Sequence, residues 1–355
     1  MEHAKRFVVN IVTWNSERFL SNLFASLEAQ TSQEVTVSVV DNASTDGTQS
    51  WIQTHHPEVS MLRNFRNQGF ARAHNQGMAI ALSRWQEDAD LSQRYVCILN
   101  PDIVLDSSCI EEILRYMDAH PDVAIAGPKL YRAIRRMDDE TDPYAIDRTD
   151  VIDSAGLSIK KTRAVVDRGA GEKDAGQFDR IAPFGISGAA MVIRASALKT
   201  LALAEHEIFD ESFFAYKEDA DLCWRARLLG LRIELISTAI AWHHRFARDP
   251  GGANPFLGML RLLKTVWQRP PLVVRASRRN QIWMEWKNDD AINRWTHAFW
   301  IILHGTLAIG ASFMVPQYLR GTMEAWMGRG QIFAKRRLLL ARRKASPEEM
   351  RKWFV

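Results

Sequence analysis

The sequence contains few cysteines and lacks the features of a secreted or disulfide-stabilised protein. Its 355 residues include three cysteines, an odd number without the paired spacing of a zinc cluster. The first apolar stretch, residues 7–12, is only about six residues long, shorter than a secretory signal requires. These absences indicate a reducing compartment, and we expect the protein to stay on the cytosolic side.

Glycine is missing where two common classes of nucleotide-binding enzyme need it. The turn after the first predicted strand reads Thr13-Trp-Asn-Ser-Glu17 and contains no glycine. A dinucleotide-dependent oxidoreductase would carry Gly-x-Gly-x-x-Gly there, and a sugar-1-phosphate nucleotidyltransferase would carry a glycine-rich phosphate loop. The turn therefore argues against both classes. Of the two, the nucleotidyltransferase stays the nearer alternative to the function inferred below.

Charge is divided unevenly along the chain. Residues 251–355 hold 18 Lys and Arg against 6 Asp and Glu, whereas residues 1–250 hold 28 against 36. Seven of the twelve tryptophans also fall in residues 251–355. A basic, Trp-rich segment behind an acidic body predicts an anionic partner, and a membrane surface fits better than nucleic acid because no nucleic-acid motif is present.

The first 250 residues alternate short apolar runs with helical patterns, which predicts an α/β domain. We expect strands near residues 7–13, 35–40, 59–62, 95–99, 189–193 and 233–236. We expect helices near residues 16–30, 48–55 and 71–84. Residues 132–182 are rich in charge and too long for a plain connection, so we interpret them as a functional flap rather than as packing.

The carboxyl-terminal region, residues 251–355, is predicted to be helical. Residues 256–267 place apolar side chains on one helical face, and residues 298–315 carry no formal charge. The second stretch is borderline for crossing a bilayer, which needs about 20 apolar residues. Because its flanks are basic, we favour a helix that lies in or re-enters the membrane interface, and a soluble helical cap is the alternative.

Two polar turns follow predicted strands, where α/β sheets bind ligands. In Asp41-Asn-Ala-Ser-Thr-Asp46, a carboxylate could accept hydrogen bonds from a pyrimidine ring or a ribose, or could simply cap the next helix. In Asn100-Pro-Asp102, the carboxylate could bind Mg²⁺ or Mn²⁺, or could be one more turn residue. Neither turn decides between its two interpretations.

Two further groups are ambiguous in the same way. Glu218-Asp-Ala-Asp221 could supply a general base, or could form an ion-paired helix start with Arg225 and Arg227. His243 follows an apolar run, where a histidine is usually structural, but beside a carboxylate-bound metal ion it becomes a candidate ligand. The order of these groups along the chain carries more information than any one of them.

Together these motifs resemble the family 2 glycosyltransferases, in particular the branch of rhamnosyltransferase-like and galactofuranosyltransferase-like enzymes. The resemblance covers residues 7–246 and rests on residues 9–19, 39–48, 67–77, 99–103, 185–194 and 213–230. It implies the GT-A fold, a single nucleotide-binding α/β domain (residues 1–250) around a mixed, mostly parallel sheet. It also implies an inverting, metal-dependent transfer from a nucleoside-diphosphate sugar.

The resemblance also implies roles for individual residues. Asp219 matches the catalytic base and Glu218 its neighbour, while Asp102 and His243 match the metal ligands. The positions that match nucleotide-sugar contacts are Thr13, Asn15, Asp41, Asn67, Gly69, Asn75 and Asn100. Ser187, Gly188 and Ala189 match the acceptor-side loop.

Two departures from the family pattern narrow the expectation. Asn100 replaces the first acid of the metal motif, which leaves Asp102, His243 and the diphosphate to hold the ion. The Gln-x-x-Arg-Trp motif of processive members is absent after Arg225, so we expect one or a few additions. The resemblance favours dTDP-L-rhamnose as donor, ahead of other dTDP- or UDP-sugars.

The expected acceptor is a glycan or lipid-linked glycan in cell-surface polysaccharide biosynthesis. Its place would be the cytoplasmic face of the cell membrane, where residues 256–344 would hold the enzyme peripherally or monotopically, with no nucleic acid as partner. A catalytically silent membrane-bound scaffold is the alternative from a different class, and the presence of Asp102, Asp219 and His243 argues against it.

Overall fold

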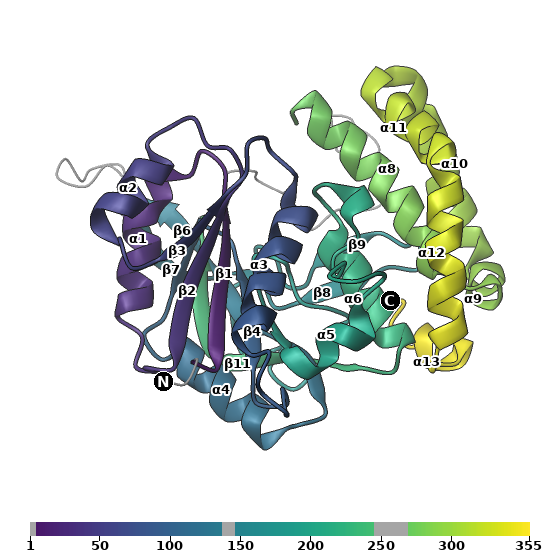
Figure 1. Cartoon of the computed structure of the whole chain (residues 1–355). Coiled ribbons are helices and arrows are strands. Elements are labelled where there is room, and N and C mark those ends of the chain that lie inside the picture. Colours follow the sequence, from purple (N-terminus) through teal and green to yellow (C-terminus); the bar gives the residue numbers. More distant parts are fainter. Residues whose placement is uncertain (1–4, 137–145, 245–268) are drawn as a thin grey trace.

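The computed structural model describes residues 5–136, 146–244 and 269–355 and has a large mixed sheet at its centre (Figure 1). The sheet order is β3-β2-β1-β4-β10-β6-β11-β5, with β7 paired to β6. Its strands are β1 (Phe7–Thr13), β2 (Val35–Asp41), β3 (Ser60–Arg63), β4 (Tyr95–Leu99), β5 (Ile103–Leu105), β6 (Val123–Arg135), β7 (Ile146–Ser154), β10 (Ala190–Arg194) and β11 (Arg232–His243).

The sheet is mixed, as expected from the sequence. Strands β3, β2, β1 and β4 run parallel to one another, and so do β6 and β11. Strand β10 is antiparallel to both of its neighbours, β4 and β6, and β5 and β7 are also antiparallel to their partners. Parallel and antiparallel pairs are therefore more evenly balanced than the sequence suggested.

Helices cover both faces of the sheet, because successive side chains of the central strands point to opposite sides. In β1, Phe7, Val9 and Ile11 join a buried cluster with helices α1, α2 and α4, whereas Val8 joins another with α3, α5 and α6. The bounds are α1 (Glu17–Glu28), α2 (Thr48–His55), α3 (Phe70–Arg84), α4 (Cys109–Ala119), α5 (Ala195–Leu201) and α6 (Glu218–Leu228).

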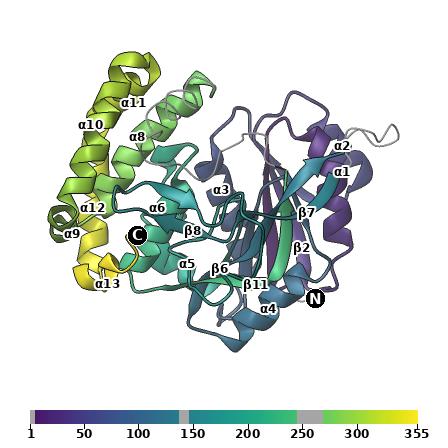
Figure 2. The same ribbon diagram turned by 180° about the vertical axis from the view of Figure 1, so that it is seen from behind.

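The carboxyl-terminal helices form a further layer beside α6, at the right in Figure 1 and at the left from behind in Figure 2. Their bounds are α8 (Pro271–Asn288), α9 (Ala291–Thr296), α10 (Ala298–Met314), α11 (Pro316–Met327), α12 (Arg329–Arg342) and α13 (Pro347–Arg351). Trp224 of α6 shares a buried cluster with Trp283, Ile332 and Phe354. This layer is thus packed onto the α/β domain.

The structure describes only one of the two apolar helices that were predicted in the carboxyl-terminal region. Residues 298–315 form a helix as expected, α10. Within the part of the chain that the structure describes, no helix is both long and apolar enough to cross a membrane. The amphipathic helix expected at residues 256–267 lies outside the described residues.

Residues 132–182, interpreted from the sequence as a flap, contain strands. Residues 137–145 of this segment lie outside the described residues, but β7 pairs antiparallel with β6 and so belongs to the main sheet. The hairpin of β8 (Leu157–Ile159) and β9 (Val165–Asp167) follows it. Ile152, Leu157 and Ile159 are buried, so these parts of the segment also serve packing.

Candidate active site

The ends of β1 and β2 carry the first group of predicted ligand-binding residues. Asp41 accepts hydrogen bonds from the Thr13 hydroxyl (2.9 Å), the Ser44 hydroxyl (2.6 Å) and the Gln49 amide (2.6 Å). Asn15, in the left-handed region with a φ of 51°, accepts a hydrogen bond from the Thr45 backbone N–H. Asp41 is buried, so in this conformation it organises the turn that a nucleotide would meet.

The loop before α3 is tied to the end of β2. The Asn42 amide donates to the side-chain oxygen of Asn67 (2.9 Å) and to the Gly69 carbonyl (3.1 Å). Gly69 has a φ of 83°, and a Cβ there would lie 2.5 Å from the Phe214 carbonyl oxygen. Only glycine allows this close approach, so Asn67 and Gly69 bring the loop against the segment that precedes the predicted base.

Asn75 has a structural role in this conformation. Its amide nitrogen donates to the Phe209 carbonyl and to Glu211, and its oxygen accepts from the backbone of Ile208 and Phe209. These four bonds use both donors and both lone pairs of the amide, which leaves no group for a ligand. In this arrangement Asn75 joins α3 to residues 208–211, and its contact with the nucleotide sugar stays a prediction.

The predicted metal ligands lie together at the carboxyl-terminal ends of β4 and β11. Nε2 of His243 is 3.4 Å from a carboxylate oxygen of Asp102. Nδ1 of His243 is 2.8 Å from a carboxylate oxygen of Asp153, in β7. Burial lowers the pKa of His243, but Asp102 and Asp153 outweigh it and raise that pKa to about 10. Without a metal ion the two carboxylates thus favour the protonated imidazolium, and an ion bound at Nε2 would have to displace its proton.

Asp153 was missed by the sequence analysis. It lies 90 residues before its partner His243, inside the segment interpreted as a flap, and only the pairing of β7 with β6 brings it to the site. A metal-ligating histidine usually donates its second ring N–H to a carboxylate, which fixes the ring's orientation. The one usable signal was an acid in an apolar run, Val151-Ile-Asp153.

The predicted base is held by two backbone amides. One carboxylate oxygen of Asp219 accepts from the Gly188 N–H (2.9 Å), and the other accepts from the N–H of Ala220 (2.7 Å). Burial raises the pKa of Asp219, while these amides act in the opposite direction. The residue as a whole is partly buried.

Residues 187–189 connect this carboxylate to the metal motif. Ser187 lies at the start of the turn, Gly188 binds Asp219, and the Ala189 carbonyl accepts from the Asn100 backbone N–H at 2.9 Å. The turn leads into β10, which pairs with β4. The predicted acceptor-side loop therefore bridges the predicted base and the Asn100–Asp102 turn.

The ion-paired helix start, the alternative interpretation of this motif, applies to Asp221. Asp221 accepts from Arg225 at 3.0 Å, and both side chains are fully buried. Glu218 is buried, and one of its carboxylate oxygens has no hydrogen-bond partner among the residues that the structure describes. Burial and the nearby Asp219 charge raise the pKa of Glu218 well above its usual range. The acids of the motif are thus not equivalent.

The glycosyl transferase family 2 model matches residues 8–201, more than half of the chain. The chain belongs to this family. It is a glycosyltransferase with the GT-A fold. The match ends before α6, so it includes Asp41, Asp102 and residues 187–189 but not Asp219.

Relatives and solved structures agree with this membership. The N-acetylglucosaminyl-diphospho-decaprenol L-rhamnosyltransferase of Mycobacterium tuberculosis is 27% identical over 320 residues, which cover 87% of this glycosyltransferase and 92% of the relative. The low-salt glycan biosynthesis hexosyltransferase Agl10 of Haloferax volcanii is 22% identical and covers 66% of each chain. The crystal structure of GalNAc-T7 with UDP, GalNAc and Mn²⁺ matches with a TM-score of 0.50 at 11% identity, covering 89% of this chain and 59% of that one.

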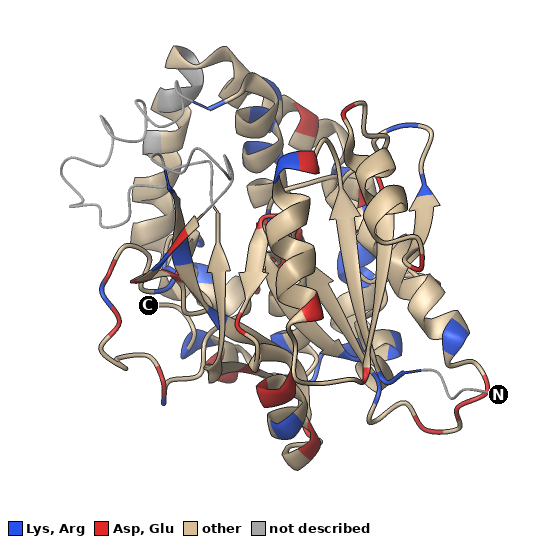
Figure 3. Cartoon of the chain, turned by 90° about the vertical axis from the view of Figure 1, so that its left-hand side faces the viewer, with Lys and Arg blue, Asp and Glu red and all other residues tan. Residues whose placement is uncertain are grey.

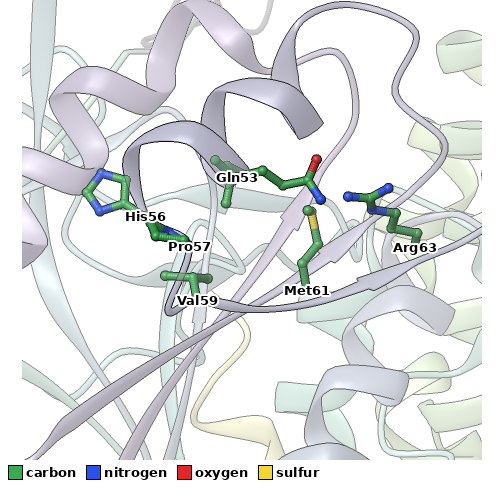
Figure 4. A pocket seen from close by; sticks show the side chains of 7 residues that line it. Gln53, His56, Pro57, Val59, Met61 and Arg63 are labelled. Carbon is green, nitrogen blue, oxygen red and sulfur yellow. The ribbon is translucent and has the colours of Figure 1, made fainter.

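A surface hollow of about 290 Å³ lies elsewhere on this glycosyltransferase, between α2 and β3 (Figure 4). Its lining includes Gln53, His56, Met61 and Arg63, and none of the predicted site residues. The chemistry of the site, described above, is concentrated instead at the turns after β4 and before β10 and at the start of α6.

Proposed function

We propose that this glycosyltransferase transfers L-rhamnose from dTDP-L-rhamnose to a lipid-linked glycan with inversion at the anomeric carbon. The observation that carries the proposal is the placement of Asp219. The backbone amides of Gly188 and Ala220 orient its carboxylate. The turn that contains Gly188 also accepts a hydrogen bond from the backbone N–H of Asn100, in the predicted metal motif. The mycobacterial relative, named for L-rhamnosyl transfer to N-acetylglucosaminyl-diphospho-decaprenol, supports L-rhamnose as the sugar and a lipid-linked glycan as the acceptor.

The residues present fit a divalent cation, Mg²⁺ or Mn²⁺. Two ligands about 2.1 Å from one ion at a right angle lie about 3 Å apart, close to the 3.4 Å between Asp102 and Nε2 of His243. Asp153 holds Nδ1, so Nε2 is the nitrogen left for the ion. No group of three or more metal-ligating side chains occurs among the described residues, so the donor diphosphate would complete the coordination. A bound ion would offset the charge on the departing diphosphate.

The reaction follows from the position of the base. Asp219 takes the proton of the acceptor hydroxyl, whose oxygen forms a bond to C1 of the donor sugar. The bond from C1 to the diphosphate breaks on the opposite face and leaves with its electron pair, so the configuration inverts in one step. Burial and the neighbouring Asp219 charge raise the pKa of Glu218 well above its usual range, which disfavours a second negative charge beside the base.

A ligand panel tests the donor and the metal together. The melting temperature is measured with dTDP-L-rhamnose, UDP-GlcNAc and GDP-mannose, each with Mn²⁺, Mg²⁺ or EDTA. Since only a bound ligand stabilises the native state, dTDP-L-rhamnose with a metal ion is expected to give the largest increase. A larger increase with another nucleotide sugar would overturn the donor, and an equal increase in EDTA would overturn the metal.

The same proposal includes attachment to the cytoplasmic face of a membrane. Helices α9–α11 expose the apolar side chains Trp295, Phe299, Trp300, Ile302, Leu303, Ile309, Met314, Leu319, Met323, Trp326 and Met327. An exposed apolar surface of this extent is unusual for a monomeric protein. Arg320 and Arg329 are exposed beside it, and Glu324 is paired with Arg275. Acidic and basic residues are by contrast interspersed on the side of the molecule in Figure 3.

Vesicle binding tests this attachment. The wild type is expected to sediment with vesicles that contain phosphatidylglycerol, and the double variant Phe299→Ser, Trp300→Ser is expected to lose most of that binding. Phe65→Ser, which removes an even more exposed aromatic ring far from these helices in the sequence, is the control and should bind normally. Unchanged binding by the double variant would overturn the assignment, as would a wild-type dimer in solution that the double variant breaks.

A further inference from the structure

The segment that leads into the predicted base has an unusual backbone. We call residues 213–217 the base loop, since Glu218 and Asp219 follow it directly. Phe214, Tyr216 and Lys217 have φ values of 64°, 73° and 73°, a region that non-glycine residues seldom occupy. Such a conformation is strained and persists only where the surroundings hold it in place. The base loop therefore depends on contacts from elsewhere in the protein.

One side chain of the carboxyl-terminal layer supplies such contacts. The amide nitrogen of Asn280, in α8, lies 2.9 Å from the Phe213 carbonyl oxygen and 2.8 Å from those of Ala215 and Tyr216. Asn280 is fully buried. Its two N–H groups are shared among three carbonyls of the base loop. Arg279 adds a bond to the Phe213 carbonyl at 3.0 Å.

The same helix also fixes both ends of this region. Lys287 pairs with Asp210, before the base loop, and with Asp221, after it, and all three side chains are fully buried. The Asn288 amide donates to Asp221 at 2.7 Å. Seven residues separate Asn280 from Lys287, which is about two helical turns, so both side chains lie on the face of α8 that meets the catalytic domain.

On the other side, the base loop meets the start of α3. The Ala71 backbone N–H donates to the Phe214 carbonyl at 3.2 Å, and Gly69 allows the close approach. The loop is thus held between the part of the chain expected to meet the nucleotide sugar and a helix outside the family 2 match. A shift of the loop would move the start of α6 and with it Asp219.

We propose that Asn280 is a positioning residue of the transfer reaction, which holds the base loop so that Asp219 meets the acceptor hydroxyl. This inference rests on the role of Asp219 proposed above. Since a displacement of about 1 Å can lower a rate about a hundredfold, Asn280→Ala is expected to lower kcat by roughly 10- to 100-fold. The affinity for dTDP with Mn²⁺ should change less than about twofold, because Asn280 contacts no predicted nucleotide residue.

The test compares three variants with the wild type. Asn280→Ala removes the three contacts of Asn280 with the base loop. Arg279→Gln removes the guanidinium that bonds to the Phe213 carbonyl. The Arg279 side chain is partly exposed, so this variant carries less risk to folding. Gln281→Ala is the control, because the Gln281 amide bonds to the Arg163 carbonyl and to Glu285 and not to the base loop. The measurements are kcat with dTDP-L-rhamnose, calorimetric dTDP affinity and amide hydrogen exchange of residues 213–220.

The expected result is a lower kcat and faster exchange of residues 213–220 in Asn280→Ala, with dTDP affinity and the exchange of α8 unchanged. Arg279→Gln should show the same pattern to a smaller degree, and it carries the test if Asn280→Ala does not fold. Normal kcat, or loss of dTDP affinity in proportion to kcat, would overturn the inference. If Asp219→Asn, assayed in parallel, kept its turnover, the proposed function would fail instead, and the exchange data would still report whether Asn280 holds the loop.

Discussion

Replacing Asp153 by alanine removes the carboxylate that lies 2.8 Å from Nδ1 of the buried His243. A hydrogen bond to a charged group contributes about 1.5–3 kcal/mol. Since 1.4 kcal/mol is a factor of ten, the apparent affinity for Mn²⁺ should fall roughly 10- to 100-fold, in line with the effect of other residues that orient metal ligands. At saturating Mn²⁺, kcat should approach that of the wild type, because Asp153 acts through His243 and is not among the residues expected to meet the donor or the acceptor.

The assay is a Mn²⁺ titration of the transfer rate at fixed donor and acceptor. Asp150→Ala is the matched control, since it removes a carboxylate of the same strand whose partner, Lys173, is exposed. Asp153→Asn keeps an oxygen that can accept the proton of His243, so it should lie between the wild type and Asp153→Ala. Identical Mn²⁺ dependence in Asp153→Ala and the wild type would refute the metal site, as would equal losses in Asp153→Ala and Asp150→Ala.

Three further predictions concern the residues around the base. Because burial raises the pKa of Asp219, the acid limb of the kcat/KM profile should lie above the ordinary aspartate value of about 3.9, and a limb at or below that value would contradict the assignment. The pKa of Glu218 is raised more strongly, so ionisation of Glu218 destabilises the fold as pH rises through that pKa. Glu218→Gln should therefore raise the melting temperature more at pH 9 than at pH 5, and an equal increase at both would oppose this. Gly69→Ala places a Cβ 2.5 Å from the Phe214 carbonyl oxygen and should lower the free energy of unfolding by about 1–3 kcal/mol, which an unchanged urea midpoint would exclude.

Local patterns in the sequence predicted the first half of the fold well. The apolar runs at residues 7–13 and 95–99 became β1 and β4, and residues 48–55 became α2 with the expected bounds. These elements are buried on both faces or strongly periodic, so the sequence itself determines them. By contrast, β6 and α4 had no prediction, and β11 extends to His243, well beyond the expected residues 233–236.

The candidate site was predictable where neighbouring residues define it. The turn at residues 100–102 and the histidine at 243 lie at strand ends, and the sheet brings them together. Asp153 was missed because its position depends on the pairing of β7 with β6, which no local pattern records. The four hydrogen bonds of Asn75 are properties of the folded chain that its residue type does not reveal, and its predicted contact with the ligand stays untested.

The carboxyl-terminal layer also shows that sequence patterns do not reveal long-range contacts. Its composition suggested a membrane-facing appendage, and the exposed side chains of α9–α11 are consistent with such a surface. Composition did not reveal that the opposite side of the layer enters the catalytic domain through Lys287 and Asn280. Each of those contacts is made by a single buried polar residue within the helical pattern of α8. Its partner lies more than 60 residues earlier in the chain.

The most direct test of the central claim is the transfer rate of Asp219→Asn. The substitution keeps the size of the side chain and one oxygen to accept from Gly188, but it removes the base. With dTDP-L-rhamnose, Mn²⁺ and a lipid-linked N-acetylglucosamine acceptor, we predict that dTDP affinity is retained and that transfer falls by several orders of magnitude. Turnover near that of the wild type would contradict the assignment of Asp219 and the mechanism built on it.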